Sequence, residues 1–277
     1  MKDYLMRDNA PFTEEQWEKI DDVVVNTAKN KLVGRKIIHI YGPLGGGIQS
    51  IELDTINLNG EAELDKFGYG ETEQVEISER RFIPVPLIYK DFIMSWRDIE
   101  NIKQLGRPFD YSLVAASASA LAKKEDDIIF NGTKESEGIM SATGRLVVEK
   151  GNWSEGDTPY KDVAKAISNL MKNDSYEPHA LVVSTDLYLK MQRIQEGTGV
   201  TILSRVKELV DGRVYQSPVI EEGKGVVVAI GPQHMDLVVG EDMVTAYRGD
   251  ENLNHLFRVM ESLALRIKRP TSICTIE

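Results

Sequence analysis

The chain is poor in the residues and runs that mark secreted, membrane and metal-binding proteins. Its 277 residues include one cysteine, which excludes an internal disulfide and predicts a reducing compartment, the cytoplasm. No stretch approaches the roughly 18 apolar residues that a membrane helix needs, and residues 1–9 lack the apolar core of a signal peptide. None of the four histidines has metal-ligand spacing to another histidine or to the cysteine: His39, His179, His234 and His255. We therefore expect no membrane segment and no metal site.

The common catalytic and phosphate-binding motifs are also missing. The glycine cluster at residues 42–47 is followed by Ile48 and Gln49, where a P-loop needs Lys and then Ser or Thr. There is no Gly-x-Ser-x-Gly elbow and no Glu-x-x-His pair of the kind that di-iron bundles carry. Cys274 lies in an apolar, alternating segment, which is typical of a structural cysteine. The sequence thus offers no catalytic residue and favours a protein that is not an enzyme.

Acidic residues outnumber basic residues in this chain. Lys and Arg total 33 against 44 Asp and Glu, giving a net charge of −11. Binding to nucleic acid depends on Lys and Arg that neutralise phosphates. The balance therefore argues against a nucleic-acid partner.

The N-terminal segment has the pattern of an amphipathic helix. Thr13 is a candidate cap with Gln16 three residues later, as in a capping box. Apolar residues follow at helical spacing, and Gly34 ends the run: Trp17, Ile20, Val24, Ala28 and Leu32. Residues 35–41 alternate and are rich in β-branched side chains, which predicts a strand directly after the helix.

The segment 59–81 is polar, acidic and punctuated by glycines, with alternation around Val75 and Ile77. This pattern predicts a long two-stranded hairpin. Such a hairpin has too little apolar surface to be stable alone, so we expect it to need another subunit.

The rest of the chain alternates helices and strands. Residues 111–130 predict a long helix whose first half, 115–122, consists almost entirely of small residues, as in a helix at the centre of a fold. After Trp153, helical segments alternate with apolar strands, which indicates a mixed α/β domain. Alternating apolar residues from Phe257 to Ile267 predict one long strand, ended by Pro270.

Several short blocks, in their order and spacing, resemble encapsulins, the shell proteins of bacteria and archaea. They are Thr13–Trp17, Gly34-Arg35-Lys36, Gly42-Pro43, Lys90–Asp98, Glu125–Gly132 and Arg266–Pro270. The resemblance covers nearly the whole chain and implies an α+β fold, that of the tailed-phage major capsid protein. It would divide the chain into an N-terminal helix and first P-domain strand (1–41), an extended E-loop hairpin (42–82), a P-domain with its spine helix (83–155), an A-domain (156–230) and return strands of the A- and P-domains (231–277).

The function that this resemblance implies is structural. Encapsulin subunits self-assemble into an icosahedral nanocompartment and enclose enzymes that carry a C-terminal targeting peptide. The cargo expected from the family is a ferritin-like protein, another iron-oxidising protein or a dye-decolourising peroxidase, for iron storage or defence against oxidative stress. The competing interpretation is a prophage major capsid protein of the same fold.

The resemblance also assigns site residues. The cargo peptide would bind between the N-terminal helix and the P-domain, at Ala28, Leu32, Arg35, Ile38, His39, Met243 and Thr245. A five-fold pore would be lined by Glu196, Gly197, Thr198, Gly199 and Val200, with Glu196 as the charged member. No cofactor is required, but some encapsulins stack a flavin on a tryptophan at the place of Trp96.

Overall fold

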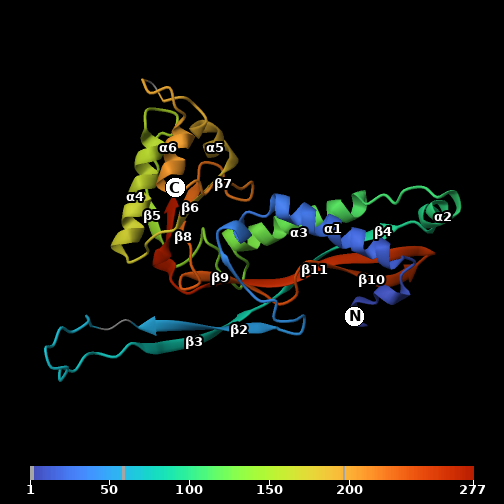
Figure 1. Ribbon diagram of the computed structural model, residues 1–277, viewed down its shortest axis with the longest axis horizontal. Coiled ribbons are helices and arrows are strands. Elements are labelled where there is room, and N and C mark those ends of the chain that lie inside the picture. The colour runs from blue at the N-terminus through green and yellow to red at the C-terminus, as the bar shows by residue number, and fades with distance from the viewer. Residues whose placement is uncertain (1–2, 58–59, 196) are drawn as a thin grey trace.

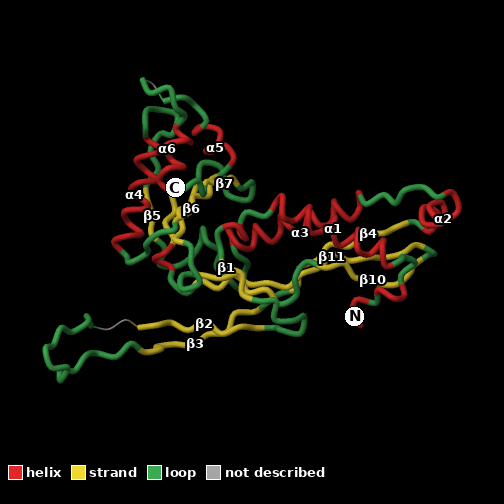
Figure 2. Tube along the Cα trace, viewed as in Figure 1, coloured by secondary structure: helices red, strands yellow, loops and turns green. Residues whose placement is uncertain are grey.

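The structure, a computed structural model, describes residues 3–57, 60–195 and 197–277 and arranges them as two bodies and a long arm (Figure 1). In the first body, helices α1 and α3 lie along a sheet that contains the long strand β11. The second body is compact and contains α4, α5 and α6. The arm, made of β2, β3 and residues 60–75 between them, extends away from both bodies (Figure 2).

The first body is built on β11, which is hydrogen-bonded along both edges. Its first half pairs antiparallel with β10 on one side and β4 on the other, and its second half pairs with β9, which in turn pairs parallel with β1. The strands are β1 (His39–Tyr41), β4 (Leu87–Met94), β9 (Met235–Val239), β10 (Val244–Glu251) and β11 (Asn254–Ile267). The long strand predicted up to Pro270 is confirmed.

Helix α1 (Glu14–Lys31) begins at the predicted capping box. The Thr13 hydroxyl accepts the backbone N–H of Gln16 at 3.3 Å, and the Gln16 side chain accepts that of Thr13 at 2.9 Å. The helix buries Trp17, Ile20 and Val24 against strands β4 and β11 and helix α3. The apolar stripe is therefore a packing face along most of its length.

Helix α3 (Ser112–Asn131) uses its small residues in two ways. On one face, Ala118 and Ala122 are buried, which lets α1 approach closely. On the opposite face, Ala116 and Ala120 are exposed. The alanine-rich half thus both packs a core and leaves open space beside the helix.

The second body has its own sheet in the order β5-β12-β8-β6-β7. The strands are β5 (Leu146–Val148), β6 (His179–Val183), β7 (Val214–Gln216), β8 (Gly225–Ala229) and β12 (Ile273–Ile276). The helices are α4 (Thr158–Lys172), α5 (Thr185–Met191) and α6 (Ile202–Leu209). The C-terminal strand thus returns to the sheet formed by the middle of the chain.

Three expectations about local structure need correction. The strand predicted over 35–41 is shorter, because Gly34–Lys36 forms the 3-10 turn η3 and only His39–Tyr41 is extended. The hairpin predicted over 59–81 has its strands further apart, in β2 (Ser50–Asn57) and β3 (Glu76–Pro84), while residues 60–75 form a loop and Asn59 lies outside the described residues. Helix α2 (Trp96–Leu105) was not predicted.

The remaining elements are short 3-10 turns: η1 (Asp3–Leu5), η2 (Arg7–Asn9) and η4 (Pro270–Ser272). The predicted domain bounds stay a prediction. We note that β5, within the segment 83–155, pairs in the sheet of the second body. Among the described residues, no helix combines the length and apolar character that crossing a bilayer requires.

Candidate functional site

An apolar groove of about 390 Å³ runs beside the C-terminal half of α1. Helix α1 gives it one wall, η3 and β1 give a second, and the segment before β10 gives the third. Its lining residues are Val25, Ala28, Lys29, Leu32, Arg35, Lys36, Ile40, Asp242 and Met243. We call this feature the groove.

The groove has a buried floor and an exposed apolar rim. Leu32 and Ala28 pack with Ala122 of α3 and are buried. Val25 and Ile40 are each 41% exposed. Exposed aliphatic side chains on a concave surface can bury more area only when another chain covers them. The groove is thus suited to an apolar segment of a partner.

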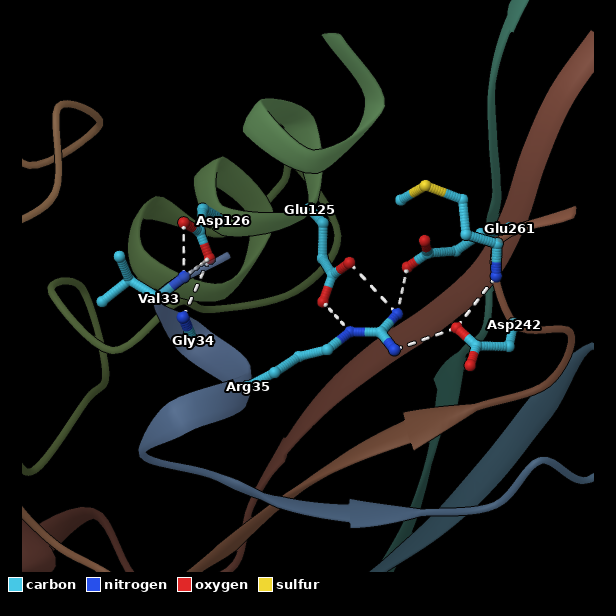
Figure 3. Close-up of polar contacts among 8 residues, drawn as sticks. Val33, Gly34, Arg35, Glu125, Asp126, Asp242 and Glu261 are labelled. Carbon is cyan, nitrogen blue, oxygen red and sulfur yellow. Dashed lines mark hydrogen bonds and ion pairs between the residues drawn. The ribbon is translucent and has the colours of Figure 1, made fainter. Parts of the chain in front are cut away.

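Arg35 lies at one end of the groove and is held by three carboxylates (Figure 3). Its Nε donates to Glu125 at 2.7 Å, and its terminal nitrogens donate to Glu261 at 3.1 Å and to Asp242 at 2.9 Å. The side chains of Glu125 and Glu261 are fully buried. The cluster therefore joins η3 to α3 and β11, and leaves one ion pair at the groove surface.

The carboxylates of this cluster repel each other as well as attract Arg35. Burial, followed by the charge of Glu125, raises the pKa of Glu261 well above its ordinary value. Glu261 therefore keeps its proton to a higher pH than an exposed glutamate. This lowers the negative charge around Arg35 and limits the cost of burying two carboxyl groups.

The turn after α1 is fixed by a second carboxylate of α3. Both oxygens of Asp126 accept the backbone N–H of Val33, and Oδ1 accepts that of Gly34 at 2.9 Å. A Cβ on Gly34 would lie 2.5 Å from the end of the Ile129 side chain, so a larger residue there would require Ile129 to move. This close approach sets the direction in which Arg35 leaves the turn.

The structure brings together four of the residues assigned to cargo binding, namely Ala28, Leu32, Arg35 and Met243. The other three do not line the groove. Ile38 is buried in the core between the bodies' strands, Thr245 is fully buried in β10, and His39 is exposed on β1. Cargo binding by any of them stays a prediction.

Sequence reasoning missed Val25, Lys29, Lys36, Ile40 and Asp242. Ile38 was assigned by the resemblance; in the structure it is buried in the core, and Ile40, two residues later, lines the groove instead. Val25 could have been found from its place next to the buried stripe of α1. No sequence signal pointed to Asp242.

The segment predicted to line a pore connects α5 and α6 at the far end of the second body (Figure 1). Backbone bonds from Gln195 N to Val200 O at 2.9 Å and from Thr198 N to Gln195 O at 3.2 Å close it into a compact loop. Gly197 and Gly199 have φ of 78° and 71°, which favours glycine. Glu196 lies outside the described residues, and the pore stays a prediction.

Trp96 begins α2, and its residue is 42% exposed beside an open polar hollow. Part of this residue is thus accessible from the hollow. Within the described part of the chain, this hollow contains no second aromatic ring that would enclose a flavin. Flavin binding at Trp96 stays a prediction.

Two further features bear on chemistry. Among the described residues, no group of three or more His, Cys, Asp or Glu is arranged to hold a metal ion. Cys274 is fully buried in β12, and burial raises the pKa of its thiol to about 12. The thiolate is therefore scarce at neutral pH, and Cys274 serves as a packing residue.

Comparison with known proteins agrees with this architecture. A family model described as "Encapsulating protein for peroxidase" matches residues 1–264. The type 1 encapsulin shell protein EncA of Myxococcus xanthus is 40% identical over 279 residues, covering 100% of this chain and 97% of that protein. A diheme-cytochrome-encapsulin shell fusion protein of Kuenenia stuttgartiensis is 42% identical over 268 residues, covering 96% of this chain and 74% of that protein.

Solved structures show the same fold. The virus-like particle of Pyrococcus furiosus superposes with a TM-score of 0.79 at 23% identity, covering 95% of this chain and 100% of that one. The capsid of Myoviridae phage XM1 superposes with a TM-score of 0.64 at 14% identity, covering 86% of this chain and 88% of that one. The fold is thus the tailed-phage capsid fold, and the chain belongs to the encapsulins, as a shell protein that forms a capsid-like compartment.

Proposed function

We propose that this shell encloses cargo enzymes that dock in the groove through a C-terminal targeting peptide. The observation that carries the proposal is the exposed apolar rim formed by Val25 and Ile40 above a buried floor. An extended peptide with a few apolar side chains would cover this rim. Each anchor would contribute roughly 1.5–3 kcal/mol when fully buried.

We further propose that the cargo is a redox or iron-handling protein, for iron storage or defence against oxidative stress. Two relatives support this: the names of the Kuenenia stuttgartiensis and Pyrococcus furiosus proteins describe fusions of an encapsulin shell to a diheme cytochrome and to a ferritin-like protein. Such fusions hold a partner at the shell by a covalent link. In this chain, the groove would replace that link.

The prophage capsid interpretation is not favoured. The relatives with 40% and 42% identity are encapsulin shell proteins, whereas the phage capsid matches at 14%. The net charge of −11 also gives little reason to expect packaged DNA.

The docking test uses residues whose replacement spares the fold. Leu32 is a poor choice, because it is buried against Ala28 and Ala122. Val25→Asp and Ile40→Asp instead place a charge on the exposed rim. Asn26→Asp is the matched control, since it adds the same charge to α1 at an exposed position outside the groove.

The measurement is the number of fluorescent proteins per purified shell, with the fluorescent protein carrying the C-terminal segment of a candidate cargo. Burying a charge in an apolar contact costs more than one anchor contributes. We expect each rim variant to lose about tenfold or more in loading, and Asn26→Asp to load like the parent. Full loading in both rim variants would contradict docking in the groove.

A further inference from the structure

A second, larger cavity of about 700 Å³ lies where the first body meets the second. Its walls are the C-terminal end of α1 and the turn η3, the outer face of α3, and the β7 region with the start of α5. The exposed alanines of α3, Ala116 and Ala120, leave the space open. It is distinct from the groove, although Lys36 borders both. We call it the lysine cavity.

Three lysines from three separate elements border this cavity: Lys31 at the end of α1, Lys36 in η3 and Lys123 in α3. All three are exposed, and within the described part of the chain none forms an ion pair. The contact that Lys36 makes is with the ring of Tyr215, at 5.8 Å from its centroid. The charge of Lys36 acts on Asp126, which borders the same cavity, so the cavity gathers three ammonium groups around one carboxylate.

The rest of the cavity wall also offers donors. The hydroxyl groups of Thr185, Tyr188 and Tyr215 border it, and the structure shows no side-chain hydrogen bond for them among the described residues. One carboxylate, Asp126, borders the cavity, but its oxygens already accept the N–H groups of Val33 and Gly34. The wall thus carries three ammonium groups and several hydroxyl groups that can donate, together with the amide side chains of Asn30 and Gln216.

We propose that the lysine cavity binds a small phosphate-bearing ligand. A phosphate oxygen accepts hydrogen bonds from ammonium and hydroxyl groups, and charge-assisted bonds of this kind are the strong ones. The volume is in the range of small-molecule sites and exceeds that of a single phosphate ion, so we expect two linked phosphates to bind more tightly than one. The site requires neither cargo nor the groove, so its test is independent of the test of the docking proposal.

The test uses cargo-free assembled shells in phosphate-free buffer, titrated with pyrophosphate in a calorimeter. We expect saturable binding of one pyrophosphate per subunit that weakens as salt is added. The double variant K31Q/K123Q removes two of the ammonium groups, and we expect its affinity to fall by about tenfold or more. Lys36 is kept, since it also borders the groove.

The matched control is K124Q/K172Q, which removes the same charge. Lys124 neighbours Lys123 on α3 but pairs with Asp127, and Lys172 ends α4; neither borders the cavity. We expect this control to bind pyrophosphate within about twofold of the parent. Inorganic phosphate and adenosine triphosphate form the other arms, and distinguish a free phosphate from a phosphate ester as the source of the same group.

Three outcomes would overturn the proposal. The first is the absence of saturable binding of all three probes to the parent shell. The second is an equal loss in K31Q/K123Q and K124Q/K172Q, which would mean that only overall charge matters. The third is tighter binding of a short oligoglutamate than of pyrophosphate, which would assign the cavity to an acidic peptide.

Discussion

The arm and the second body show two opposite ways of handling apolar side chains. In the second body, every residue of β6 and β8 is buried. In the arm, Leu64, Phe67 and Tyr69 are 100%, 71% and 87% exposed. A two-stranded hairpin with a loop of this size cannot bury such side chains on its own. The second body thus buries its core within one chain. The base of the arm packs on the first body through Ile51 and Ile83, whereas its tip leaves apolar side chains exposed, and we expect other subunits of the shell to cover them.

Charging the tip of the arm should have the largest effect. Phe67 and Tyr69 stack at 6.3 Å between ring centroids, and the variant Phe67→Asp/Tyr69→Asp removes this apolar contact surface. We expect closed shells to be lost while the subunit stays folded, as seen by sedimentation and circular dichroism. The control Tyr176→Asp/Leu253→Asp changes two apolar residues outside the arm that are also exposed, and it should assemble. Normal shells from the arm variant would refute the distinction between the two regions.

Breaking the Arg35 cluster should have the next largest effect, now on the subunit itself. Arg35→Met leaves the buried Glu125 and Glu261 without their cation. Loss of one partner of a buried ion pair typically costs 3–5 kcal/mol of unfolding free energy, so we expect a loss of about that size. Chemical denaturation in the non-assembling arm variant would measure it. The exposed arm pair gives the control, since Arg80 is exposed and Arg80→Met should change the unfolding free energy little.

A cavity in the second body should destabilise the subunit where the same kind of truncation in the arm does not. Leu181 is fully buried in β6, and Leu181→Ala should cost about 2–5 kcal/mol. Leu64→Ala truncates a fully exposed leucine of the arm and should change the unfolding free energy by less than about 0.5 kcal/mol. Equal losses in the two variants, measured in the same non-assembling background, would mean that the arm has a core of its own.

The smallest expected effect is the dependence of the unfolding free energy on pH. Burial, opposed by the N–H groups of Gly34 and Val33, raises the pKa of Asp126 to about 6. The folded state then binds the proton more tightly than the unfolded state, so stability falls as pH rises from about 4 to about 6. We expect Asp126 to contribute a fall of about 2 kcal/mol, which Asp126→Asn removes, in addition to the fall that the raised pKa of Glu261 contributes.

The arm offers the control for this prediction. A hydrogen bond from Arg80 lowers the pKa of Asp54, so Asp54 titrates below this window. Asp54→Asn should therefore leave the slope between about pH 4 and pH 6 unchanged. A slope that Asp126→Asn leaves unchanged would contradict the assignment of this raised pKa to Asp126.

The sequence was sufficient to predict an element where its local signals and its tertiary packing favour the same structure. The capping box at Thr13, the apolar stripe of α1 and the alternation along β11 predicted these elements at nearly their observed positions. It failed at η3, because the turn depends on Asp126, far along the chain, accepting the N–H groups of Val33 and Gly34. A local pattern of alternating residues contains no information about such a long-range contact.

The sites were less predictable than the fold for the same reason. Arg35 and Glu125 stand in blocks that carried the resemblance, yet nothing in the sequence paired them with each other or with Glu261. The lysine cavity joins α1, η3, α3 and the second body, so its donors become neighbours only after the two bodies have packed. Exposed lysines in a sequence give no sign of such convergence.

The central claim, that other subunits complete the arm, is tested most directly by hydrogen exchange. The amides of β2 and β3 would be compared between assembled shells and the non-assembling arm variant, with those of β6 and β8 as the internal reference. We predict that the arm amides are protected only in shells, while the reference strands are protected in both. Strong protection of β2 and β3 in the isolated subunit would contradict the account.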